Sequence, residues 1–267
     1  MKPRYSYLTK KEEDQAIIQI IDTLLDPSLV CSGPHRKKQW EKGWEQNLKE
    51  GSIEPHYFGK YKINRLNGRF VKALDKNYER DMLYTIVDHI TDKYLKNIDD
   101  VYEFGCGTGH ILQRIRQQNY EIELHGLDWT KSSQKILDKL GIWNCNFDFF
   151  KPSSLKLLPN SAVYTVAALE QLGTNYKKFV SYLLKVKPSI IIHIEPIEEL
   201  LDPTNLLDNL SLKYFKKRKY LSGYLTYLRK LEKCGKIRII ETKRSGIGSL
   251  FIEGYSIIIW TIKGGKQ

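Results

Sequence analysis

The sequence predicts an α/β fold: a doubly wound, mostly parallel seven-stranded sheet with an antiparallel last strand, preceded by an N-terminal helical and loop extension. From residue 100 onward, short apolar runs alternate with helical patterns, which is typical of βαβ units in a sheet covered on both faces. Only the stretch KRSGIGSLFIEG separates the last two apolar runs, so we expect a hairpin-like return there. With 267 residues, 41% of them hydrophobic, the chain can form one large domain with an appendage.

The first part of the chain, residues 1–97, is expected to form the extension that covers a substrate site. Residues 10–26 carry apolar positions at helical spacing. Residues 32–75 are rich in aromatic, glycine and basic residues with weak periodicity, which indicates a loop-rich segment with short helices. Residues 77–96 predict an amphipathic helix that begins after Asn77 as its cap.

The second part, residues 98–267, is expected to be the sheet domain, with a helical insertion at 203–234. Its apolar runs predict strands at 101–104, 122–127, 143–147, 162–167, 190–194, 237–241 and 255–262. The helical patterns between them lie at about 109–118, 132–140, 175–185 and 204–233.

Composition limits the class of protein. No apolar run approaches the roughly 20 residues that a membrane-spanning helix needs, and the start of the chain does not read as a secretory signal. The cysteines are scattered without a CxxC pair, which predicts reduced thiols in a cytoplasmic protein; they are Cys31, Cys106, Cys145 and Cys234. The net charge of +12 favours anionic partners, unless the dispersed lysines are simply a solvated surface.

The strongest motif is DDVYEFGCGTGH, in which an apolar strand leads to Glu103 and then to Gly105, Gly107 and Gly109. Ligands of open α/β sheets bind beyond the carboxyl ends of the strands, so this turn lies where a ligand belongs. The dinucleotide fingerprint is G-x-G-x-x-G, but position 110 here is a histidine. The spacing is instead G-x-G-x-G, with an acid two residues before the first glycine.

This motif resembles the first motif of the class I, Rossmann-like S-adenosylmethionine-dependent methyltransferases, (D/E)-x-G-x-G-x-G. The resemblance implies that the loop, including Cys106, lies against the methionine portion of S-adenosyl-L-methionine. It covers residues 98–200 well and extends to 262 through the family's antiparallel last strands, whereas the first 97 residues match nothing general in the family.

Two further acids follow the spacing of that family. Asp128 ends the second predicted strand, 19 residues beyond Gly109, and an acid there can accept hydrogen bonds from ribose hydroxyls. Asp148 follows the third strand, where the family often contacts the adenine amino group. The adjacent Trp129 and Phe149 either pack on adenine or are ordinary core or rim aromatics.

Candidate catalytic groups lie at the ends of the fourth and fifth strands. His193 and Glu195 are two residues apart, hence on the same side of a strand, and Glu170 follows the fourth strand. His193 is the first candidate for a general base, with Glu195 and Glu170 as supports; alternatively, His193 is a hydrogen-bonded core residue and Glu195 a helix cap. No metal is assigned, although Glu170, Glu195 and Asp202 are available to a divalent ion as in some sugar O-methyltransferases.

Two other segments can shape an acceptor site. An aromatic and basic lid over the cofactor, or simple packing of a helix on the sheet, explains Trp40, Trp44, His56, Tyr57, Phe58, Lys60 and Tyr61. Residues 212–230 interleave basic residues with tyrosines, which suits either nucleic-acid binding or a solvated amphipathic helix.

The expected function is S-adenosylmethionine-dependent methylation, with oxygen as the default target, of a polar and possibly anionic small molecule such as a sugar, a nucleotide sugar or a related metabolite. The amino-methylating tetrapeptide (N/D)-P-P-(Y/F) is replaced by ALEQ, and no cysteine lies near the fourth strand to act as a nucleophile. The alternatives are an RNA or protein methyltransferase that uses 212–230 and a non-catalytic cofactor-binding partner. No RNA-binding module is recognisable, which favours a small acceptor.

Overall fold

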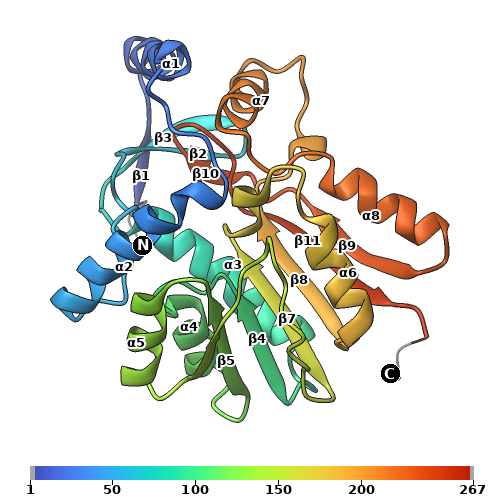
Figure 1. Ribbon diagram of the computed structural model, residues 1–267. Coiled ribbons are helices and arrows are strands. Elements are labelled where there is room, and N and C mark those ends of the chain that lie inside the picture. The colour runs from blue at the N-terminus through green and yellow to red at the C-terminus, as the bar shows by residue number, and fades with distance from the viewer. Residues whose placement is uncertain (1–3, 265–267) are drawn as a thin grey trace.

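The computed structural model describes residues 4–264 and contains eight α-helices within that range (Figure 1). The helices are α1 (Lys10–Leu25), α2 (Lys37–Glu50), α3 (Tyr78–Tyr94), α4 (His110–Gln118), α5 (Lys131–Lys139), α6 (Lys177–Val186), α7 (Leu206–Arg218) and α8 (Tyr224–Lys233). Three short 3-10 helices are η1 (Pro34–Arg36), η2 (Leu169–Leu172) and η3 (Glu198–Leu200).

The main sheet has seven strands in the order β6-β5-β4-β7-β8-β11-β9. The strands are β4 (Asp100–Phe104), β5 (Glu123–Asp128), β6 (Trp143–Asn146), β7 (Ser161–Val166), β8 (Ile190–Glu195), β9 (Ile237–Lys243) and β11 (Ser256–Ile262). The first five pair in parallel, whereas β11 runs antiparallel to both β8 and β9. The predicted fold class, with its antiparallel last strand, is confirmed.

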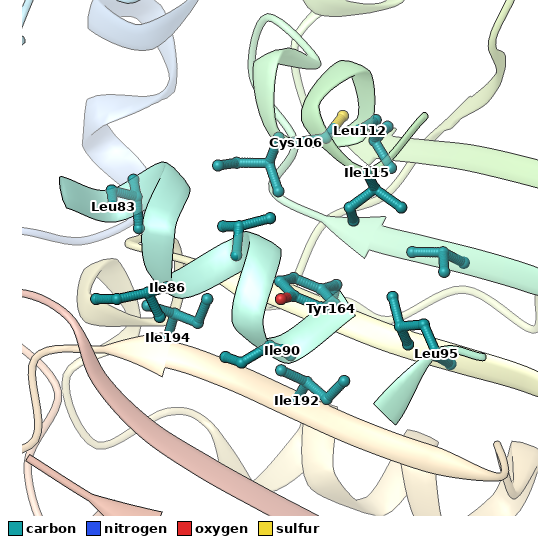
Figure 2. Close-up of a cluster of buried hydrophobic side chains, with 14 of the residues drawn as sticks. Leu83, Ile86, Ile90, Leu95, Cys106, Leu112, Ile115, Tyr164, Ile192 and Ile194 are labelled. Carbon is teal, nitrogen blue, oxygen red and sulfur yellow. The ribbon is translucent and has the colours of Figure 1, made fainter. Parts of the chain in front are cut away.

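Helices cover both faces of this sheet (Figure 1). On one face, apolar residues of α3, α4 and α5 pack on β4, β7 and β8; Figure 2 shows Ile86 and Ile90 of α3 beside Ile194 and Ile192 of β8. On the other face, α6 and α8 pack on the alternate residues of the same strands. Because strand side chains alternate between faces, both sets are apolar and the strands are buried throughout.

The N-terminal segment differs from the prediction in having a sheet of its own. β1 (Tyr5–Tyr7), β3 (Arg69–Ala73) and β2 (Ile63–Leu66) form an antiparallel sheet that ends with β10 (Ile247–Ser249) from the C-terminal part of the chain. Short strands with mixed polar and aromatic residues carry little periodicity, which is why the sequence pattern indicated loops and helices.

The boundary predicted at residue 97 lies just after helix α3. Helix α3 lies before it, yet Leu83, Val87 and Ile90 belong to the core of the main sheet. Asn77 does precede α3, but its side chain makes no capping hydrogen bond. The helix is therefore held chiefly by its apolar face.

The helical pattern predicted over 204–233 is two helices. α7 ends where Lys219 adopts a left-handed backbone conformation with φ of 53°, and α8 begins after Gly223 with φ of 72°. α8 packs on the main sheet, whereas α7 packs against α1 and the small sheet. Between residues 4 and 264, no helix has both the length and the apolar character that a membrane span requires.

Candidate functional site

The glycine loop leaves β4 at Phe104 and turns into α4 at the carboxyl end of the parallel strands. The amides of Gly105 and Cys106 both donate to the carbonyl oxygen of Leu127 on β5, at 2.6 and 3.1 Å. Gly105 has φ of 75°, and a Cβ there would lie 2.5 Å from Cβ of Ala168. A side chain at this position would therefore close the space between the loop and the end of β7.

A pocket of about 720 Å³ opens above this loop, and we call it the glycine-loop pocket. Its wall on the N-terminal side is α2, whose Trp40 and Trp44 rings stack at 5.4 Å. Trp44 lies over Gly107, where an added Cβ would be 2.7 Å from Cζ2 of the indole. These indoles therefore take the position expected of a lid over the loop.

Hydrogen bonds fix α2 in this place. Glu41 accepts hydrogen bonds from the amides of Lys131 and Ser132 at the start of α5, each 2.8 Å long. Thr108 of the glycine loop donates to the carbonyl oxygen of Ile53, 2.6 Å away, just beyond the helix. The lid is thus attached to the main domain on both sides of the pocket.

Asp128 lines the pocket and also organises its floor. One carboxylate oxygen, Oδ1, accepts from the amide and the hydroxyl of Thr130, and the other, Oδ2, accepts from the amide of Gly107 at 3.1 Å. A carboxylate has about four lone-pair sites, so Oδ2 keeps capacity for one more donor from a ligand. Burial raises the pKa of this carboxyl, and the three hydrogen bonds oppose that shift.

Glu103 is a pocket residue whose side chain has an unmet hydrogen-bond requirement. It is 2% exposed, and its Oε2 atom is buried without a hydrogen-bond partner. Burial, and then the nearby charge of Asp128, raise the pKa of Glu103 well above its ordinary value. Two neighbouring buried carboxyls in one pocket favour a ligand that carries positive charge and N–H donors.

Other predicted cofactor residues divide into lining and supporting groups. Trp129 and Phe149 line the pocket, as does Cys106, although the Cys106 side chain belongs to the core beneath the loop. Asp148 is not among the lining residues; its Oδ1 accepts from the amide of Phe150 within the same turn. An adenine contact by Asp148 stays a prediction.

The structure does not bring His193 to the pocket. The ring is fully buried beneath α8, with Nδ1 2.8 Å from the hydroxyl of Thr165 and Nε2 2.8 Å from that of Tyr224. Burial lowers the pKa of His193 to about 3, so the ring is neutral and both nitrogens are engaged. Alternation along β8 correctly puts Glu195 on the same face, but α6 and α8 cover this face. We therefore do not assign His193 as a base.

Glu195 anchors the segment that follows β7. Its carboxylate accepts hydrogen bonds from the amides of Ala168 and Leu169 at 3.0 Å and of Glu170 at 3.3 Å, and so caps η2. Burial raises the pKa of Glu195 to about 8, against the effect of these N–H groups. Just before the cap, Ala167 has φ of 48°, a left-handed conformation that is uncommon without glycine. Glu195 acts here on the shape of the site, through η2.

A second, larger cavity adjoins the glycine-loop pocket, and we call it the aromatic cavity. Its empty space is about 1720 Å³, and it shares with the first pocket Trp40, Trp44, Tyr57, Ala167 and Gln171. The aromatic residues Tyr61, Tyr214, Tyr220, Phe251 and Tyr255 line this cavity but not the glycine-loop pocket. The predicted lid residues His56, Tyr57, Lys60 and Tyr61 also lie along it, whereas Phe58 is buried in the main core.

Glu170 is the predicted catalytic residue that the structure does place in this cavity. Burial raises its pKa to about 7, opposed by the hydrogen bond from Gln171 and by the positive charges of Arg218 and Arg36. Gln171 donates from Nε2 to Oε1 of Glu170 at 2.8 Å, and its own Oε1 is buried without a partner. A carboxyl that titrates near neutrality thus lies beside a free acceptor at the junction of the two cavities.

The sequence did not single out four groups at the site. His110 and Thr108 line the glycine-loop pocket, and burial lowers the pKa of His110 to about 3. Arg36 and Glu79 line the aromatic cavity; Glu79 accepts a hydrogen bond from Tyr255, and burial raises its pKa to about 7. In the sequence, Glu79 is one of several acidic residues in the predicted helix 77–96, and Arg36 is a single arginine in a segment of weak periodicity, so no pattern marked either residue.

The proposed divalent-ion ligands Glu170, Glu195 and Asp202 do not converge. Asp202 accepts hydrogen bonds from the amide and hydroxyl of Thr204 in an exposed turn. Across residues 4–264, no group of three histidine, cysteine or acidic side chains has a geometry that could hold a metal ion. The four cysteines are all free.

The basic and aromatic stretch 212–230 exposes most of its charges, whereas its rings are buried except for the half-buried Tyr227. Tyr214 and Tyr220 are each 8% exposed, and Tyr224 is fully buried against His193. Stacking on nucleic-acid bases needs exposed ring faces, so this stretch has the character of two amphipathic helices.

No protein-family model matches the sequence, and no curated protein matches it either. Solved structures with a similar fold include the methyltransferase domain of bacterial CtHen1-CN, at 19% identity and TM-score 0.46, covering 69% of this chain and 98% of that one. The plantazolicin methyltransferase BpumL in complex with SAH has 14% identity and TM-score 0.48, covering 93% of this chain and 99% of that one. Human N-acetylserotonin methyltransferase in complex with SAM has 14% identity and TM-score 0.46, covering 70% of this chain and 57% of that one. At such identities the function has to be argued from the residues of this chain.

Proposed function

We propose that this protein is an S-adenosylmethionine-dependent methyltransferase that methylates an oxygen of a polar small molecule. The observation that carries the proposal is the unpartnered Oε2 of buried Glu103 in the glycine-loop pocket. The ammonium group of the methionine portion supplies the missing N–H donors and a positive charge. Asp128 would accept a ribose hydroxyl through Oδ2, and Trp129 and Phe149 would pack beside the base.

The residues at the junction of the two cavities suit the acceptor step. When bound, S-adenosylmethionine supplies a methyl group on sulfur, which the acceptor oxygen takes in line as the carbon–sulfur bond breaks and its electron pair stays on sulfur. The free Oε1 of Gln171 would accept a hydrogen bond from a second O–H or N–H group of the polar acceptor and hold the molecule in place. Glu170, with a pKa of about 7, would take the proton that the hydroxyl releases.

A small acceptor is favoured because the aromatic cavity is a hollow lined by residues of α2, α7 and the segment before β11, with several aromatic side chains in its wall. The alternative of an RNA or protein acceptor held by residues 212–230 gains no support from their buried rings. The alternative of a non-catalytic partner predicts cofactor binding without turnover, or no binding.

The proposal is tested by calorimetric titration of the purified protein with S-adenosylmethionine and S-adenosylhomocysteine. We expect both to bind, and Glu103→Gln to weaken them while leaving the fold intact, since the glutamine keeps the shape but removes the charge. An incubation with methyl-labelled cofactor and a fractionated metabolite pool should then label a small molecule. The product should be either a methyl ether, which is stable to alkali, or a methyl ester, which alkali hydrolyses. No binding of either compound to the folded protein would refute the proposal.

A further inference from the structure

Two arginines line the aromatic cavity, and each has a buried N–H group without a partner. Arg36 ends η1 and is 7% exposed, with Nη1 unpartnered; Arg218 ends α7, with Nε unpartnered. Buried donors in folded proteins are almost always paired, so two such groups facing one cavity indicate a missing acceptor.

The main chain holds the two arginines together. The amide of Ser32 donates to the carbonyl oxygen of Arg218 at 2.7 Å, and the Ser32 hydroxyl donates to that of Lys219. The turn that carries Arg36 is thereby attached to the end of α7, although the residues are far apart in sequence. This arrangement does not depend on any contact between the two charged groups.

Neither arginine has a carboxylate within ion-pair distance. Between residues 4 and 264, ion pairs engage four other arginines: Arg4, Arg80, Arg114 and Arg244. The buried Arg65 has no ion pair either, but it donates to the carbonyl oxygens of Leu250, Leu207 and Phe251 and to the Ser211 hydroxyl. Arg36, by contrast, donates only to the neutral Oε1 of Gln39, through Nε.

Adjacent like charges in a hollow are unfavourable, and an anion offsets that cost. Burial, and then the charge of Arg218, lower the pKa of Arg36. The charges of Glu170 and the two guanidinium groups influence one another, but among residues 4–264 no ion pair joins them. Neither arginine therefore has an anionic partner in contact, and an anionic ligand would supply one.

The aromatic rings around the two arginines indicate the chemical character of the rest of the ligand. The guanidinium of Arg218 lies 5.8 Å from the ring centre of Tyr214 and 5.1 Å from that of Tyr220, and Arg36 lies 5.6 Å from that of Trp40. A ring beside each guanidinium group leaves the N–H edge of that group free to bind an anion. The same rings offer flat apolar surfaces to the part of the ligand that carries the anion.

We propose that Arg36 and Arg218 form an anion subsite that binds a carboxylate or phosphate on an aromatic or similarly planar methyl acceptor. The assignment of the bound molecule as the acceptor rests on the proposed function; the anion subsite itself does not.

The experiment uses benzoate and phenyl phosphate as anionic probes and benzyl alcohol as a neutral one, titrated calorimetrically into the full chain without cofactor. The variants are Arg36→Met and Arg218→Met, with Arg229→Met as the matched control, because Arg229 is exposed on α8 and loses the same charge. We expect at least one anion to bind, benzyl alcohol to bind more weakly, and both cavity variants to raise the Kd of the anion about 10- to 100-fold. Arg229→Met should stay within about twofold of the wild type by the same reasoning. A preference for benzoate identifies a carboxylate, and a preference for phenyl phosphate identifies a phosphate.

Equal affinity for the neutral and anionic probes, or wild-type anion affinity in both cavity variants, would overturn the subsite. Loss of folding is checked by thermal unfolding without ligand: a buried cation kept for binding predicts an equal or higher Tm in Arg36→Met, whereas a structural role predicts a lower one. A wild-type protein that binds the anions but not S-adenosylhomocysteine would refute the proposed function and leave the subsite standing.

Discussion

The glycine-loop pocket and the aromatic cavity lie side by side but are built in different ways. The floor of the first comes from consecutive strand ends and turns, at 103–109 and 127–130, and much of it is main chain held by main-chain hydrogen bonds. The second is assembled from side chains at 36–61, 167–171, 214–220 and 249–255. A site made from local turns can be recognised by spacing, whereas a site made from distant side chains exists only once the chain has folded.

The largest expected effect is on turnover, and it should arise in the aromatic cavity without changing cofactor affinity in the glycine-loop pocket. Glu170→Gln should lower kcat by about 100-fold or more, because a general base contributes on that scale, and should leave the Kd of S-adenosylhomocysteine unchanged. A base must be deprotonated, so the wild-type rate should rise with pH through about 7, and this limb should vanish in the variant. Glu79→Gln is the control, since Glu79 lies in the same cavity with a pKa of about 7. A limb that vanishes in the control and survives in Glu170→Gln would transfer the role to Glu79.

The next effect belongs to the glycine-loop pocket. Asp128→Asn should raise the Kd of S-adenosylhomocysteine about 30-fold, because hydrogen bonds to a charged group contribute about 2 kcal/mol. Asp148→Asn should change it less than about tenfold, because Asp148 is not among the residues that line the glycine-loop pocket. Calorimetry measures both. An equal loss in the two variants would show that Asp148 is as important to the cofactor as Asp128.

A smaller effect tests whether the lid and the glycine loop fit against each other. Gly107→Ala should weaken cofactor binding about tenfold. The added Cβ would meet Trp44 at 2.7 Å and displace the indole, and the loss of one aromatic contact with the ligand has about this effect on affinity. Gly141→Ala is the matched control: its φ of 61° is similar, but nothing lies within 4 Å. In urea unfolding, Gly141→Ala should lose about 1 kcal/mol of stability, and Gly107→Ala should lose more, because displacing Trp44 adds to the backbone strain. Weakened binding in the control would attribute the effect to backbone strain.

The smallest effect on the site is expected from His193→Ala, which should leave cofactor affinity and turnover unchanged. It should instead lower the free energy of unfolding at pH 8 by about 2–4 kcal/mol, since it leaves a cavity and two unpaired hydroxyls. The folded pKa of His193, about 3, is below its unfolded value, so the neutral ring stabilises the wild type above about pH 6.5. This contribution falls by about 1.4 kcal/mol per pH unit below that value, so the difference between the two proteins should narrow at pH 5. A large fall in turnover would restore His193 as a catalytic candidate.

The sequence predicted the structure well where a local backbone conformation or a strand end needs a particular type of residue. The alternating strands, the glycine loop and Asp128 follow from spacing, and the structure has the strands and places the loop and the acid together. Alternation also put His193 and Glu195 on one face correctly, but both faces of β8 are covered, and an apolar strand pattern does not tell which end reaches a cavity. The small sheet and Arg36 were missed because short strands and single arginines carry no periodic signal.

Arg65 on β2 bears on the order in which parts of the molecule fold. Its guanidinium donates to the carbonyl oxygens of Leu250 and Phe251, so one wall of the aromatic cavity forms only when this later segment has reached β2. The turns around the glycine loop need no segment beyond β8 for their own hydrogen bonds. Arg65 and these carbonyl acceptors are 185 and 186 residues apart, whereas Gly107 and Asp128 are 21 apart. Because closing a longer loop costs more chain entropy, we expect the turns of the glycine loop to form before this wall of the aromatic cavity.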